Sequence, residues 1–300
     1  MAARFPSARR ARLAALAIAA AGTLAAPAAT RLTAQGAATV DTTGMALVPA
    51  GDFWMGRTRL WLIDEIGWQI RDRADDRPVH RVELAAYFID TKEVTNADYA
   101  RFVAAGKAAA PYHWRGDSPP ASKASLPIYN VSWQEAADYC GWLGKRLPTE
   151  AEWEKAARGG VADVDYPWGN DYFTDDAAGA GAEAAASTPP TKAKPPVKHA
   201  HSNATTGPVP VGSFEANGYG LYDVSGNVWE WVADWYDLNY YSSSPVTNPS
   251  GPASGLYKVI RGGSWADPET RQGTVYFRNY TAPDLRAPTL GMRCAVTAPK

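Results

Sequence analysis

Two segments alternate apolar residues with polar or turn-forming residues and predict short strands. Residues 45–56 combine this alternation with Pro and Gly, which predicts a strand and a tight turn. Residues 81–90 show the same two-residue period and predict a second strand. Its core-facing residues are expected to be Val82, Leu84 and Phe88.

Three further segments carry the pattern of a helix start, in which a hydroxyl residue stands three positions before a carboxylate. The pairs are Thr95 with Asp98, Ser132 with Glu135, and Thr149 with Glu152. Because both side chains can bond to backbone N–H groups that the first helical turn leaves without partners, each pair predicts a helix. Apolar residues follow at helical spacing, and Cys140 falls on the buried face of the second helix.

The remaining chain lacks long periodic segments. Residues 171–207 are rich in Ala, Gly, Pro, Thr and Lys, which is typical of a flexible surface insertion. After residue 209, Gly, Asn, Trp and Tyr dominate and predict irregular loops on short strands. We therefore predict one irregular α+β domain over residues 45–300, loop-rich, with few short strands and about three helices.

The first residues have the pattern of an export signal. A basic stretch precedes an Ala-rich apolar run at 13–24, and Ala26-Pro27-Ala28 resembles a cleavage site. We predict a signal peptide at 1–28, with an approximate cleavage position, and a tether at 29–44. The protein is then expected in the periplasm or another extracytoplasmic compartment, with membrane anchoring as the alternative if the signal is retained.

Composition narrows the classes of partner. The 30 basic and 31 acidic residues give a net charge of −1, so no field recruits nucleic acid. The chain contains 12 Trp and 15 Tyr, whose large rings require a core, a cleft or an interface. Its two cysteines, Cys140 and Cys294, are expected to form a disulfide in an oxidising compartment; a pair of buried free thiols is the alternative.

A series of ordered motifs resembles one known family. The motifs are Leu47-Val-Pro-Ala-Gly51, Glu93-Val-Thr-Asn96, Asn130-Val-Ser-Trp133, Gly144-Lys-Arg-Leu-Pro-Thr-Glu-Ala-Glu-Trp153, Tyr166-Pro-Trp-Gly169, Asn217-Gly-Tyr-Gly-Leu-Tyr222, Gly226-Asn-Val-Trp-Glu-Trp231 and Arg261-Gly-Gly-Ser-Trp265. Together they resemble the formylglycine-generating enzyme, or sulfatase-modifying factor, family from about residue 45 to residue 296. The resemblance implies a C-type-lectin-like fold and matches Cys140 and Cys294 to the positions that the family bridges.

The resemblance also implies structural calcium. Its ligands would be the side chains of Asp223 and Glu230 and the carbonyls of Gly226 and Val228, which suits an ion that takes six to eight oxygens. Alternatively, the two carboxylates are ordinary turn residues.

A second calcium site of the family is matched less completely. Asn203 and the carbonyl of Thr205 stand at its later ligand positions, but Ala and Gly replace the Asn expected earlier.

The catalytic chemistry of the family is not matched. The catalytic members of the family resemble copper oxidases that bind copper through two thiolates placed shortly after the Gly-Gly-Ser-aromatic motif, whereas residues 262–276 contain no cysteine. Thiolate suits Cu(I) and carboxylate does not replace it, so copper is not expected. Trp229 and Ser264 match positions that line the family's pocket.

Iron is likewise unsupported. A related oxidative branch binds iron through a His cluster in an added helical domain, which has no counterpart in this sequence. The four His residues have no ligand spacing, although ligands from distant loops remain possible.

The sequence supports two alternative functions. The first is a binding or scaffold subunit for an envelope protein or membrane-associated complex, with a recognition surface at Tyr276, Arg278, Tyr280 and Arg286. For the two arginines, pairing with carboxylates to hold loops is the alternative.

The second function is an oxidoreductase that acts on a protein or small-molecule substrate through a non-cysteine metal site. Asp267, Glu269 or Tyr276 would lie near its reacting centre. Only this second function involves a peptide substrate.

Overall fold

A computed structural model describes residues 40–58, 74–170, 207–267 and 270–299. The predicted signal peptide, the tether up to residue 39 and nearly all of the predicted insertion lie outside the described residues. Asn203, Thr205 and Glu269 lie outside them as well. In the described part of the chain, no helix is both long and apolar enough to cross a membrane.

The first four strands and the last strand form two small antiparallel sheets. One sheet has the order β1-β4-β9, from β1 (Met45–Val48), β4 (Tyr87–Asp90) and β9 (Ala295–Thr297). The other pairs β2 (Gly51–Met55) with β3 (His80–Leu84). The first sheet therefore joins the start of the domain to its last strand.

The prediction of one continuous strand over residues 81–90 is wrong, because β3 and β4 are separate strands. Val82 and Leu84 are buried as predicted, but Phe88 is only partly buried. Between the two strands, the backbone N–H of Ala85 donates to Asn248 Oδ1 at 2.8 Å instead of continuing a ladder. The break shifts the alternation by one position, so that Tyr87 and Ile89 enter the core.

A four-stranded sheet has the order β7-β6-β5-β8. Its strands are β5 (Trp229–Trp235), β6 (Lys258–Arg261), β7 (Asn279–Thr281) and β8 (Leu290–Gly291). β6 is antiparallel to β5 and to β7, whereas β8 runs parallel to β5.

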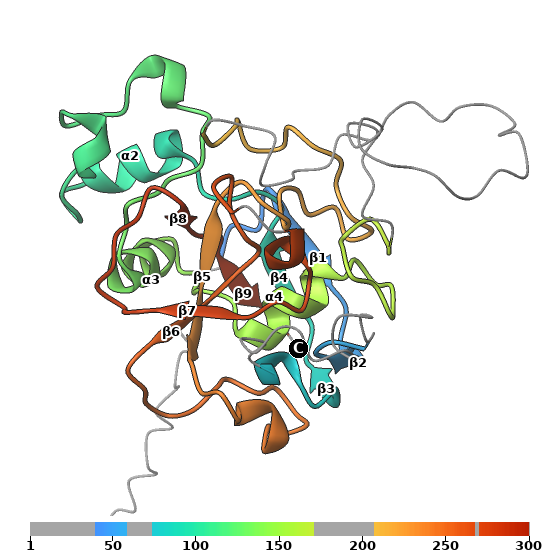
Figure 1. The fold of residues 1–300 in the computed structure, drawn as a ribbon. Coiled ribbons are helices and arrows are strands. Elements are labelled where there is room, and N and C mark those ends of the chain that lie inside the picture. Colours follow the sequence, from blue (N-terminus) through green and yellow to red (C-terminus); the bar gives the residue numbers. More distant parts are fainter. Residues whose placement is uncertain (1–39, 59–73, 171–206, 268–269, 300) are drawn as a thin grey trace, which may run out of the picture. The chain divides into compact units, whose positions relative to one another are not determined.

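The three predicted helices are confirmed as α2 (Asn96–Ala104), α3 (Trp133–Trp142) and α4 (Glu150–Ala157). Each predicted hydroxyl–carboxylate pair forms a complete capping box. Both α3 and α4 contact β5 (Figure 1). Short 3-10 helices occur at Ala74–Asp76, Tyr112–Trp114, Ala121–Lys123, Tyr240–Ser242 and Thr270–Gly273.

A disulfide joins Cys140 of α3 to Cys294, with 1.95 Å between the sulfur atoms and 154 residues between the two positions. Both residues are fully buried in a cluster with Trp231, Leu290 and Met292. The predicted bridge is thus confirmed, and the alternative of two free thiols is excluded. The structure confirms a loop-rich α+β domain with short strands.

Candidate functional site

Trp229 and Ser264 lie close to a carboxylate from the loop after β6. Ser264 donates to Asp267 Oδ2 through its backbone N–H at 2.6 Å and through its hydroxyl at 2.7 Å. Burial raises the pKa of Asp267, and hydrogen bonds from Ser264 and from the Trp229 side chain partly oppose that rise. The two pocket positions inferred from the resemblance therefore meet at one acidic group.

The two glycines before Ser264 give this turn its shape. Gly262 and Gly263 both have positive φ, at 96° and 76°, a conformation that L side chains rarely adopt. A Cβ on Gly263 would also lie 3.0 Å from the carbonyl oxygen of Gln272. The turn therefore packs its backbone closely against Gln272 and Gly273.

The chemistry of this site differs from that of a thiolate centre. A carboxylate is a hard oxygen ligand and can also hold a proton, but it does not replace thiolate for Cu(I). Tyr276, expected near the same centre, is fully buried, and its carbonyl oxygen accepts a hydrogen bond from Arg261 Nη1 at 3.1 Å. It therefore takes part in the packing of Arg261.

The predicted calcium side chains have different surroundings. Asp223 Oδ2 accepts from the backbone N–H of Gly212 at 2.5 Å, while its buried Oδ1 has no hydrogen-bond partner among the described residues. Glu230 is fully buried and holds Arg293 through two hydrogen bonds, both 2.7 Å long. The indole N–H of Trp153 donates to the same carboxylate at 2.7 Å. Asp223 thus keeps an open oxygen, whereas both oxygens of Glu230 already accept hydrogen bonds.

A third buried carboxylate, Glu93, belongs to this region and was not predicted as a site residue. It accepts from Asn227 Nδ2 at 2.6 Å and from the backbone N–H of Val228 at 3.1 Å. Its pKa lies well above the usual value, because burial and the charges of Asp223 and Glu230 disfavour ionisation. The only sequence signal was its place in the motif at residues 93–96.

The described donors around Asp223 match calcium in their chemistry but not in the number of side chains. Among the described residues, Arg293 acts favourably on Glu93, and Arg293 and Lys92 act favourably on Asp223, so three carboxylates face two basic side chains. All available ligand atoms are oxygens, as calcium requires. In the described part of the chain, no three His, Cys, Asp or Glu side chains are arranged to hold a metal ion, so carbonyl groups would have to complete the coordination.

The predicted recognition surface is wrong for two of its four residues. Tyr276 is fully buried and Arg278 is 2% exposed. Arg278 Nε and Nη2 bind the two carboxylate oxygens of Glu150 at 2.7 and 2.9 Å. The alternative of a structural arginine is therefore correct for Arg278, since an ion pair to α4 draws it into the core.

Arg286 and Tyr280 remain near the surface. Arg286 is exposed and pairs with Glu135 of α3 at 2.9 Å. The ring of Tyr280 stacks on Tyr236 with 4.0 Å between centroids and lies 5.1 Å from Tyr257. Tyr257 is 42% exposed and the adjacent Leu256 is 80% exposed. We call Tyr236, Leu256, Tyr257 and Tyr280 the tyrosine patch.

The two described histidines lie in separate environments. His80 Nδ1 lies 3.0 Å from the carbonyl oxygen of Pro78, and its ring packs edge-on against Tyr241. His113 stacks on Tyr129 with 4.0 Å between centroids, and burial lowers its pKa to about 4. The structure therefore brings these two histidines into no shared metal site; His199 and His201 lie outside the described residues.

Comparison with known proteins identifies the family. The model of the sulfatase-modifying factor enzyme 1-like domain matches residues 30–298. The formylglycine-generating enzyme of Streptomyces coelicolor is 34% identical, and the match covers 85% of this chain and 90% of that protein. A Mus musculus protein named inactive C-alpha-formylglycine-generating enzyme 2 is 37% identical, with coverage of 62% and 55%.

Solved structures agree with the sequence matches. Treponema denticola variable protein 1 is similar with a TM-score of 0.63 and 25% identity, covering 85% of this chain and 95% of that one. PvdO from Pseudomonas aeruginosa has a TM-score of 0.61 and 27% identity, with coverage of 85% and 94%. This chain belongs to the family of sulfatase-modifying factor enzyme 1-like domains.

Proposed function

We propose that this protein is an exported, calcium-stabilised binding or scaffold subunit of the bacterial envelope, without thiol–copper formylglycine-generating activity. The disulfide is the observation that supports the absence of thiol–copper chemistry. The sequence contains two cysteines, and both are joined in the bridge. No thiolate is left to bind Cu(I), and the matching loop presents Asp267 instead. A relative bearing a name that includes "inactive" supports the existence of non-catalytic members.

The tyrosine patch supports the binding role. Tyr is enriched at protein interfaces because its ring supplies a large apolar area together with a polar hydroxyl group. Tyr280 lies on β7, an edge strand of the four-stranded sheet, and Leu256, next to Tyr257 in the chain, is 80% exposed. The proposed recognition surface is therefore centred on Tyr280 and Tyr257 instead of on the buried Arg278.

Calcium has a structural role in this proposal. Asp223 and the carbonyls of Gly226 and Val228 would hold the ion, while Glu230 would be shared with Arg293. A bound calcium ion supplies positive charge that stabilises ionised carboxylates and ties loops together. The open Oδ1 of Asp223 supports this assignment.

An aldehyde assay tests the absence of the thiol–copper reaction. The purified protein is incubated with copper, dioxygen and a peptide that carries the sulfatase-type cysteine, and the product is analysed by mass spectrometry. The Streptomyces coelicolor enzyme serves as the positive control. We expect no conversion of cysteine to the aldehyde by this protein, and catalytic turnover would overturn the proposal.

A second experiment tests the binding surface. The full-length protein is purified from its native envelope fraction, and its partner is quantified by mass spectrometry. Tyr257→Ala and Leu256→Ser are expected to reduce recovery of a stoichiometric partner at least tenfold. Leu47→Ala is the matched control, because Leu47 is 54% exposed on a different sheet. Equal recovery with all variants would contradict the role of the patch.

One observation favours the oxidoreductase as a second candidate. Asp267 is a partly buried carboxylate with a raised pKa, and it lies beside Ser264 and Trp229 at the family's pocket positions. Such a group can move a proton or bind a hard metal ion. Elemental analysis after purification without chelator tests this function: iron or copper near one per chain, lost in Asp267→Ala, would favour it over the scaffold.

A further inference from the structure

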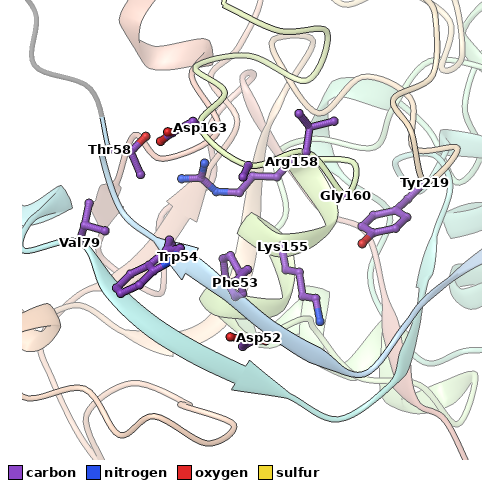
Figure 2. Close-up of a pocket in the computed structure, with 12 residues that line it drawn as sticks. Asp52, Phe53, Trp54, Thr58, Val79, Lys155, Arg158, Gly160, Asp163 and Tyr219 are labelled. Carbon is purple, nitrogen blue, oxygen red and sulfur yellow. The ribbon is translucent and has the colours of Figure 1, made fainter.

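A cavity of about 570 Å³ lies away from the residues discussed above, beside the C-terminal end of α4. Its wall combines side chains from β2, from α4 and the loop that follows it, and from Tyr219 (Figure 2). A volume of this size is typical of small-molecule sites, which range from roughly 300 to 1,000 Å³. The cavity does not include Trp229, Ser264 or Asp267.

Close packing between two loops builds one wall. The loop after α4 meets residues 217–219 so closely that a Cβ on Gly159 would lie 2.7 Å from the backbone nitrogen of Gly218. Asn217 Nδ2 donates to the carbonyl oxygens of Ala156 and Ala157 at 2.8 and 3.0 Å, which fixes this loop to the end of α4. The wall is therefore preformed by backbone contacts.

Three aromatic side chains from two segments border the cavity. Phe53 and Trp54 come from β2, and the Tyr219 ring covers Gly160, whose Cβ would lie 3.2 Å from the ring. Trp54 is 57% exposed, although an indole is costly to leave in water. Figure 2 shows Trp54 and Tyr219 at different sides of the group of lining residues. Trp54 thus offers an exposed, flat apolar surface to a ligand, whereas Phe53 and Tyr219 also pack against the core.

The formal charges of the residues that line the cavity sum to zero. Two carboxylates, Asp52 and Asp163, stand against two cations, Lys155 and Arg158. Each cation is already held by the protein: Lys155 Nζ donates to the carbonyl oxygens of Pro49 and Gly51, and Arg158 pairs with Glu154 at 2.7 Å. The cavity therefore has no excess charge that would select an ion.

Polar groups nevertheless remain available for hydrogen bonds. Only Oδ2 of Asp52 pairs with Arg81, at 2.8 Å, and Asp163 is exposed. The buried hydroxyl of Thr58 has no hydrogen-bond partner among the described residues. The lining therefore combines aromatic faces with oxygen acceptors and carries no net charge.

We propose that this cavity binds an uncharged saccharide. The C–H face of a pyranose ring would lie on Trp54, and its hydroxyl groups would donate to Asp52 and Asp163. This ligand combines a flat apolar face with many hydroxyl donors, which matches the lining better than a charged group does. The site goes beyond the proposed scaffold function, because it does not use the tyrosine patch.

Isothermal titration calorimetry of the full chain tests the proposal. The probes are neutral di- and trisaccharides built from glucose, galactose, mannose and N-acetylglucosamine, with arginine methyl ester and inorganic phosphate as charged probes. We expect at least one neutral saccharide to bind with a stoichiometry of one and a Kd below about 1 mM. Absence of binding by every neutral saccharide, or selective binding of a charged probe, would overturn the proposal.

Two variants assign the binding to this cavity. Trp54→Ala is expected to weaken the affinity at least tenfold and Asp163→Asn about three- to tenfold, because each removes an exposed contact group. Trp142→Ala is the matched control, since Trp142 is 38% exposed on α3 and does not line the cavity. Unfolding curves establish that each variant is folded. Saccharide binding that survives Trp54→Ala unchanged would place the ligand elsewhere and refute the assignment.

Discussion

Replacement of Arg278 by Met tests whether this arginine holds the core or recognises a partner. Arg278 makes two hydrogen bonds to Glu150, at 2.7 and 2.9 Å, and a third to the carbonyl oxygen of Asp75 at 2.7 Å. Met keeps much of the apolar stem but removes the positive charge. The substitution would leave the buried Glu150 with Arg261 as its remaining cationic partner. That contact is longer, with 3.2 Å between Arg261 Nη1 and Glu150 Oε1.

The expected loss of stability follows from these contacts. Breaking a buried ion pair by removing one partner costs about 3–5 kcal/mol. The remaining contact with Arg261 places the expected loss near the lower limit, at about 3 kcal/mol. Arg278→Lys keeps the charge but not the two-pronged geometry, so a smaller loss of about 1–2 kcal/mol is expected.

Urea unfolding followed by tryptophan fluorescence measures both losses, with the disulfide intact. The double variant Arg278→Met with Glu150→Gln serves as a matched comparison, since it no longer leaves a buried carboxylate charge without its partner. The loss of stability in the double variant should be smaller than the sum of the losses in the two single variants, by more than about 1 kcal/mol. A loss below about 1 kcal/mol in Arg278→Met, together with abolished partner binding, would refute the structural role.

Three further measurements address the bridge, a buried acid and calcium. Replacing Cys140 and Cys294 with Ser should lower the free energy of unfolding by roughly 4 kcal/mol, because the bridge closes a 154-residue loop. Denaturant unfolding measures this loss. An unchanged unfolding midpoint would contradict it. Burial raises the pKa of Asp234 from 3.8 to about 8, so the folded state binds this proton more tightly and stability should fall as pH rises through that interval. Unfolding at several pH values should show a flatter dependence for Asp234→Asn but not for the control Asp237→Asn, and identical slopes would exclude this origin. Adding a calcium chelator should lower the Tm of the wild-type protein and should leave the Tm of Asp223→Asn unchanged. If the chelator changes the Tm of neither protein, the result argues against bound calcium.

Local sequence patterns predicted the helices well. Thr95, Ser132 and Thr149 act within three residues of their own position, so the capping boxes are visible in the sequence. The break between β3 and β4 could not be predicted in this way, because Ala85 bonds to Asn248, 163 residues away. Alternation indicates a strand but does not show where a distant side chain interrupts its ladder.

The site was harder to predict than the fold, because partners distant in the sequence set its electrostatics. Arg278 looked like a surface residue until Glu150, 128 residues away, was placed beside it. Glu93 approaches Asn227 across 134 residues, and no spacing rule relates the two positions. The cavity beside Trp54 likewise depends on how separate loops meet. Sequence motifs thus located Asp223 and Ser264, but the charges and hydrogen bonds around them required the structure.

Residues 290–297 are synthesised late but complete several parts of the fold. β8 completes the four-stranded sheet, β9 completes the three-stranded sheet, and Arg293 supplies the guanidinium that pairs with Glu230. Cys294 provides half of the bridge to α3. While this segment is still inside the ribosome, both sheets lack a strand and Glu230 lacks its ion-pair partner. The domain must therefore remain incompletely folded until residues 290–297 have been synthesised and released, so both sheets and the bridge can form only after synthesis of this segment.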